Sequence, residues 1–144
     1  YGDHRYLHSF PTRRSSDLAD ILFLSDEALP DSPERVVRRI FDRFSSKIVV
    51  VGLGAEGALM GVRRDGFVGR FPAVKTREVI NTIGAGDALF SAFLDRFLRT
   101  QDPYLAIRQA IIFASYKIGE KGAAQGFLSG AELDEWVDNL SGVR

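Results

Sequence analysis

The sequence predicts an α/β fold with a mostly parallel sheet and a β-hairpin, and three observations lead to this class. Apolar runs at 21–24 and 48–51 flank a segment of helical periodicity, and this order of elements is that of a parallel βαβ unit. Apolar runs at 58–62 and 67–71 flank Asp65-Gly66, a pair that is typical of a hairpin turn. A glycine-rich turn then leads directly into a long apolar helix.

Three of the predicted helices begin with residues that are typical of a helix start. Ser32-Pro33 opens the helix between the first two strands, with Ser32 as the N-cap residue and the proline in the first turn. Asp102-Pro103 opens a later helix that is almost entirely apolar. Ser129 and Glu132 have the spacing of a capping box and predict the start of the last helix.

The composition excludes several classes of function. The 144 residues include 19 basic and 19 acidic side chains, so the net charge of zero favours neither nucleic acid nor an anionic membrane as a partner. No apolar run approaches the roughly 18–20 residues that span a bilayer. The absence of cysteine excludes disulfides, thiolate metal sites and a cysteine nucleophile. We therefore expect a cytoplasmic protein.

Residues 1–18 do not resemble the rest of the chain. They lack a periodic apolar pattern, and residues 8–18 match the in-frame translation of a common sequencing-library adapter. We expect this segment to be foreign to the protein. Because both histidines of the chain, His4 and His8, lie in it, no catalytic role is assigned to histidine.

The stretch 81–87, Asn-Thr-Ile-Gly-Ala-Gly-Asp, has the features of an anion site. Its glycines allow a tight turn, and the helix that follows directs free N–H groups and its positive dipole end into that turn. Asp87 adds a carboxylate beside the anion, and such a pair is what phosphoryl transfer requires. The alternative is a strand-to-helix turn in which Asp87 only caps the helix. We expect the helix to bury its apolar residues, Phe90 and Leu98 included.

This stretch resembles the second signature of the ribokinase-like (PfkB) carbohydrate kinases, which is roughly Asp-Thr-x-Gly-Ala-Gly-Asp. It matches at six of seven positions, and Asn81 stands where the family usually has Asp. The resemblance implies that Asp87 is the general base and that the N–H groups of Gly84, Ala85 and Gly86 form the anion hole. It also implies ATP with Mg²⁺ and a sugar acceptor.

The resemblance extends over residues 19–144 and implies the C-terminal, nucleotide-binding and catalytic part of a three-layer αβα ribokinase-like fold. The family's lid, most of its sheet and its sugar-binding residues would belong to a preceding segment. We therefore expect this chain to be a fragment and inactive by itself. A first strand with an exposed edge would favour association, and a homodimer is a further expectation.

Gly52, Gly54 and Gly57 follow the second strand. They superficially match the dinucleotide pattern G-x-G-x-x-G, but Gly57 leads into a strand and hairpin rather than a helix, which argues against a dehydrogenase. The stretch instead resembles the T-L-G-x-x-G loop that lies along ATP in the family, with Gly52 in place of a hydroxyl residue. The alternative is a glycine-rich entry into the hairpin that contacts no nucleotide.

The family resemblance assigns the adenine wall to the helix after Asp102-Pro103. That wall ends at Gly122-Ala123. Ile111 falls where many relatives have Asn, and Ser115 lies one turn further on. We expect both to line an apolar adenine slot rather than to make specific hydrogen bonds to the base.

The resemblance also bears on cations. Many relatives hold a monovalent cation with the first Asp of the signature and nearby backbone carbonyls. Asn81 keeps an oxygen there but loses the charge, so activation by K⁺ is left open. Relatives carry an N-x-x-E motif linked to the Mg-bound phosphates. The aligned residues are Ser25-Asp26-Glu27-Ala28, in which Asp26 or Glu27 could substitute. A solvated loop is the alternative.

The sequence thus favours ATP-dependent phosphoryl transfer to a hydroxyl of a sugar or sugar-like substrate. A nucleotide-binding module without catalysis is the second hypothesis, motivated by the altered motif at 25–28 and by Asn81. A relative that phosphorylates a vitamin precursor, such as a pyridoxal or hydroxymethylpyrimidine, is the third.

Overall fold

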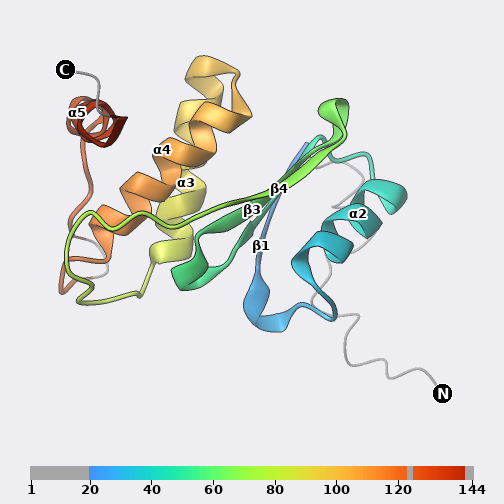
Figure 1. Cartoon of the computed structure of the whole chain (residues 1–144), viewed down its shortest axis with the longest axis horizontal. Helices are drawn as coiled ribbons and strands as arrows, with labels where there is room; N and C mark the ends of the chain where they lie inside the picture. The colour runs from blue at the N-terminus through green and yellow to red at the C-terminus, as the bar shows by residue number, and fades with distance from the viewer. Residues whose placement is uncertain (1–19, 123–124, 142–144) are drawn as a thin grey trace. The chain divides into compact units, whose positions relative to one another are not determined.

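The computed structural model describes residues 20–122 and 125–141, so the segment 1–18 that we expect to be foreign lies outside the description. The chain forms two compact units, of which one contains the residues up to 53 with 59–70 and the other contains 54–58 and the residues from 71 onward. In chain order the elements are β1 (Ile21–Ser25), η2 (Asp26–Ala28), α2 (Pro33–Arg43), β2 (Ile48–Gly52), η3 (Gly54–Glu56), β3 (Ala58–Val62), η4 (Arg63–Asp65), β4 (Phe67–Phe71), α3 (Ala85–Thr100), α4 (Pro103–Lys117) and α5 (Gly130–Ser141) (Figure 1).

The sheet has the strand order β1-β2-β3-β4. β1 and β2 are parallel, with Ile21 opposite Ile48 and Ser25 opposite Gly52, which confirms the predicted βαβ unit. The connections from β2 to β3 and from β3 to β4 are too short for a crossover, so these neighbours are antiparallel. The predicted hairpin is confirmed, and Gly66 adopts the left-handed conformation at its turn (φ 60°). The sheet is therefore mixed, and its parallel part among the described strands is the β1–β2 pair.

The core of the first unit lies between α2 and the sheet. Val36 and Val37 of α2 pack with Val49 of β2, and all three are fully buried. At Gly61 an added Cβ would lie 2.5 Å from the Val37 side chain, so this helix lies directly on β3. Ser32 occupies the predicted N-cap position, but its side chain makes no capping hydrogen bond.

In the second unit, α3 and α4 pack side by side (Figure 1). Phe93 of α3 and Ile107 of α4 are fully buried. The expectation that α3 buries all its apolar residues is wrong, because Phe90 is 42% and Leu98 70% exposed. A helix buries one stripe, and apolar residues outside it stay at the surface whatever their spacing suggests.

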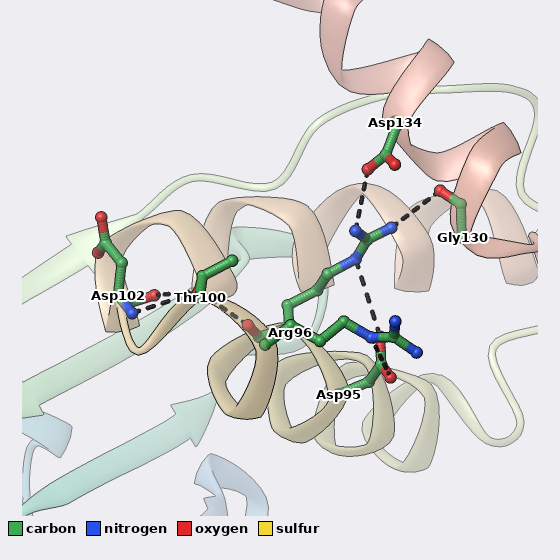
Figure 2. A network of polar contacts seen from close by, with 7 residues as sticks. Asp95, Arg96, Thr100, Asp102, Gly130 and Asp134 are labelled. Carbon is green, nitrogen blue, oxygen red and sulfur yellow. Dashed lines mark hydrogen bonds and ion pairs between the residues drawn. The ribbon is translucent and has the colours of Figure 1, made fainter.

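Arg96 joins α5 to α3, as Figure 2 shows. Its Nη1 lies 2.9 Å from Asp134 Oδ1, and its Nη2 donates to the Gly130 carbonyl at 2.9 Å. The predicted capping box of α5 is confirmed: the Ser129 N–H donates to Glu132 Oε2 at 2.7 Å, and the Glu132 N–H donates to Ser129 Oγ at 3.3 Å. The hydrogen bonds from Ser129 lower the pKa of the Glu132 carboxyl.

Candidate functional site

Residues 81–87 form a tight turn that ends in the first turn of α3. The Asn81 side-chain oxygen accepts a hydrogen bond from the Ile83 N–H at 2.9 Å, and the Thr82 carbonyl accepts one from the Ala85 N–H at 3.1 Å. Gly84 is the N-cap residue and has φ 79°, a conformation that glycine adopts without steric cost. The left-handed backbone at this position is therefore the physical reason for a glycine at 84.

The predicted anion hole and base lie on a single helical turn. Ala85, Gly86 and Asp87 are the first three residues of α3, where N–H groups have no acceptor within the helix. Gly86 and Asp87 are exposed, and a Cβ added at Gly86 would meet no atom within 4 Å. The folded chain itself therefore does not require a glycine at 86, and the space over it is open to a ligand.

The C-terminal end of α4 holds the segment that enters this turn. The N–H groups of Ile80 and Asn81 both donate to the Ile118 carbonyl, at 2.8 and 2.9 Å. Asn81 Nδ2 donates to the Lys121 carbonyl at 2.7 Å. The structure thus brings the first residue of the signature next to the end of the helix that the resemblance assigns to adenine.

Ser115 anchors the same segment one helical turn earlier. Its hydroxyl donates to the Val74 carbonyl at 2.6 Å and accepts from the Thr76 N–H at 3.2 Å. Ile111 is buried, with 6% of its surface exposed. That Ile111 and Ser115 line an adenine slot stays a prediction.

Gly122 packs closely against a neighbouring side chain. A Cβ added there would lie 2.9 Å from the Gln125 side chain, and Ala123 lies outside the described residues.

Sequence reasoning missed two residues that organise this site, Arg77 and Lys117. The Arg77 guanidinium lies 3.7 Å from the centroid of the Tyr116 ring, its Nε donates to the Tyr116 carbonyl at 2.7 Å, and its Nη1 pairs with Glu120 at 2.8 Å. Lys117 is fully buried and donates from Nζ to the Ile83 carbonyl. A lysine in the last turn of a helix is typical of any exposed helix end, so the sequence gives no sign that Lys117 is buried. No local pattern connects Arg77 with Tyr116, which lies 39 residues further along the chain.

The glycines after β2 have different structural causes. Gly57 has φ 100°, and an added Cβ would lie 2.2 Å from the Phe71 carbonyl oxygen and 2.5 Å from the Ala73 nitrogen. Gly54 has φ 55°, and a Cβ there would meet nothing within 4 Å. Backbone packing therefore accounts for Gly57 without a nucleotide, whereas the space beside Gly54 is free.

We expect Gly57→Ala to destabilise the protein by more than about 1 kcal/mol, because it combines a left-handed φ with backbone overlap. Gly54→Ala is the matched control, since it carries the φ penalty without the overlap. Urea unfolding of both variants measures the difference. Equal losses of stability would mean that the contact of Gly57 with 71–73 has no energetic importance.

Asp26 and Glu27 lie in the first unit, on the short helix η2 that follows β1, and Gly52 ends β2 in the same unit. Both acidic side chains are exposed. The remaining predicted site residues belong to the second unit. Within the residues that the structure describes, no group of three or more His, Cys, Asp or Glu side chains could hold a metal ion. None of the described helices combines the length and the apolar character needed to cross a membrane.

Several named proteins are similar in sequence to this chain. Acarbose 7(IV)-phosphotransferase of Actinoplanes sp. is 34% identical over 116 residues, which are 80% of this chain and 38% of that protein. Deoxyribokinase of Salmonella typhi is 29% identical over 107 residues, which are 74% of this chain and 34% of that protein. The chain thus spans little more than a third of the length of these relatives.

Solved structures confirm the ribokinase-like α/β fold. A microbiome-derived acarbose kinase superposes with a TM-score of 0.76 at 30% identity, over 85% of this chain and 42% of that one. A putative ribokinase II from E. coli, solved with ATP and Mg²⁺, superposes with a TM-score of 0.75 at 21% identity, over 88% of this chain and 42% of that one.

The family follows from a match of the sequence to a family profile. The profile of the pfkB family carbohydrate kinases matches residues 16–129, which include the whole signature turn and α4. With the signature at the start of α3 and the fold of the ribokinases, this chain belongs to the pfkB family of carbohydrate kinases.

Proposed function

We propose that the protein transfers the γ-phosphoryl group of ATP to a hydroxyl group of a sugar or sugar-like small molecule. The observation that carries the proposal is the exposed Asp87 carboxylate in the first turn of α3, beside the open space over Gly86. Acarbose 7(IV)-phosphotransferase and deoxyribokinase, by their names, support a sugar-like acceptor.

In the proposed reaction Asp87 acts as the general base. Its carboxylate removes the proton of the acceptor hydroxyl as the oxygen attacks the γ-phosphorus in line. A new O–P bond forms, the bond between the γ-phosphorus and the bridging oxygen breaks, and ADP leaves with the electron pair. Placement on a helix suits this role, because a base on a regular element is held more precisely than one on a loop.

The backbone N–H groups of Gly84, Ala85 and Gly86 would stabilise the charge on the transferred group. The positive end of the α3 dipole adds to this effect. The Ala85 N–H also donates to the Thr82 carbonyl, so it would be shared between this carbonyl and the phosphoryl oxygens. Pre-organised donors of this kind cost no reorganisation during the reaction.

Mg²⁺ bound with the nucleotide would neutralise negative charge on its phosphates. The exposed carboxylates of Asp26 and Glu27 are oxygen ligands of the kind that this hard cation prefers. A site with only one or two protein carboxylates also suits Mg²⁺, which takes its other ligands from phosphates and water. Within the second unit, Gly54 and Gly57 would lie along the nucleotide, with Ile111, Ser115 and Gly122 near the adenine.

The test is an ADP-release assay of the full-length protein with ATP and Mg²⁺ against a panel of sugars, nucleosides and vitamin precursors, with phosphorus NMR of the product. We expect a phosphate ester on a sugar or nucleoside hydroxyl. Phosphorylation of a pyridoxal or hydroxymethylpyrimidine alone would assign the substrate class to the vitamin precursors. ATP binding by calorimetry without turnover on any acceptor would contradict the proposal and favour a nucleotide-binding module.

A further inference from the structure

Lys117 is a fully buried cation next to the signature turn. It is the last residue of α4, and its ammonium group donates to the carbonyl oxygen of Ile83. Lysine is rarely buried completely unless its charge has a partner, because removing an ammonium group from water is costly. A residue of this kind is expected to have a specific local role.

The geometry of the peptide bond connects Lys117 to the anion hole. The Ile83 carbonyl and the Gly84 N–H belong to one planar trans peptide unit, so they point in opposite directions. An ammonium group that holds the oxygen therefore fixes the direction of the N–H. A hydrogen bond to the carbonyl also polarises the peptide unit and makes its N–H a stronger donor.

The side chain of Asn81 also contacts Ile83, the residue whose carbonyl binds Lys117. Its Oδ1 accepts from the Ile83 N–H at 2.9 Å, and its Nδ2 donates to the Lys121 carbonyl at 2.7 Å. These partners determine the orientation of the amide, because a backbone N–H can only donate and a carbonyl can only accept. The Ile83 and Lys121 carbonyls thus both accept from nitrogen donors of the protein.

These residues do not fit the monovalent cation that the resemblance to the family implies. In many relatives such a site uses the carboxylate of the first signature residue together with free backbone carbonyls. Here the first residue is an uncharged amide, its oxygen is engaged by Ile83, and one neighbouring carbonyl already binds an ammonium group. No carboxylate and no free carbonyl pair is offered by these residues.

We propose that the Lys117 ammonium group takes the place of a monovalent cation beside the signature turn and acts as a positioning residue for the Gly84 N–H. The inference rests on the proposed phosphoryl transfer. It predicts an enzyme whose rate does not depend on K⁺. Asn81 and Lys117 then form a matched pair, because an ammonium group that is covalently part of the chain needs no carboxylate to bind it from solution.

The test compares full-length wild type, Lys117→Met and the double variant Asn81→Asp/Lys117→Met in KCl and in tetramethylammonium chloride of equal ionic strength. We expect the wild-type rate to be equal in both salts. Lys117→Met should lower kcat by about 10²-fold in both, the usual effect of impairing one oxyanion donor, with a smaller effect on KM. The double variant should regain activity in KCl only. Lys75→Met, which removes an exposed lysine, is the control and should leave the rate unchanged.

Melting temperatures in the two salts provide a readout that does not need activity. The wild type should melt at the same temperature in both, and the double variant should melt at a higher temperature in KCl. A wild type that needs K⁺, or a Lys117→Met variant with wild-type kcat, would overturn the inference. If Lys117→Met does not fold, the double variant decides: a response to KCl supports the inference, and no response contradicts it. If wild type phosphorylates no acceptor in either salt, the proposed function fails, and the melting temperatures still decide the role of Lys117.

Discussion

Asp87→Asn is expected to lower kcat of the full-length protein by about 10²–10⁴-fold, the usual contribution of a general base. The amide keeps the shape of the side chain but cannot accept the proton of the attacking hydroxyl. Because Asp87 is exposed at the start of α3, the change should leave the fold intact. Steady-state kinetics with ATP and the best acceptor of the panel measure the loss, and calorimetry should show ATP binding close to that of wild type.

Asp95→Asn is the matched control for this prediction. Asp95 lies on the same helix, is also exposed, and pairs with Arg99 at 2.9 Å, away from the first turn. We expect its replacement to leave kcat unchanged. If Asp87→Asn retained wild-type kcat, Asp87 would be a helix-capping residue and the proposed mechanism would fail.

Gly86→Ala should separate stability from activity. Alanine is the better helix former, and the position has room for a Cβ, so the free energy of unfolding should rise by up to about 1 kcal/mol. The same methyl group would enter the space that the transferred phosphoryl group needs. Displacing the phosphoryl group by about 1 Å can lower the reaction rate 10²-fold, and we expect a decrease of that order in kcat/KM. Urea unfolding and steady-state kinetics on one preparation measure both effects.

Gly130→Ala gives the corresponding control in α5. Gly130 also begins a helix, and its added Cβ would have an ordinary contact of 3.8 Å with Arg96. We expect the same gain in stability with no change in activity. A Gly86→Ala variant with wild-type kcat/KM would show that nothing approaches the helix at this point, which would exclude the proposed anion hole.

Local patterns predicted most of the secondary structure. The hairpin of β3 and β4 follows from a left-handed glycine between two apolar runs, and the capping box of α5 follows from Ser129 and Glu132. These features depend on residues close in sequence, and local chemistry determines them. Burial was predicted less well, as the exposed Phe90 and Leu98 illustrate, because the buried stripe of a helix depends on where its neighbour packs.

The signature turn shows the same division between local and distant causes. The sequence by itself predicted the family, a tight glycine turn and the position of Asp87 in the first turn of a helix, since the signature that carries these predictions spans seven consecutive residues. Only the tertiary structure decided that Lys117 lies against Ile83 and that Arg77 stacks on Tyr116. These pairs are 34 and 39 residues apart in the chain, and no local periodicity connects residues at such separations.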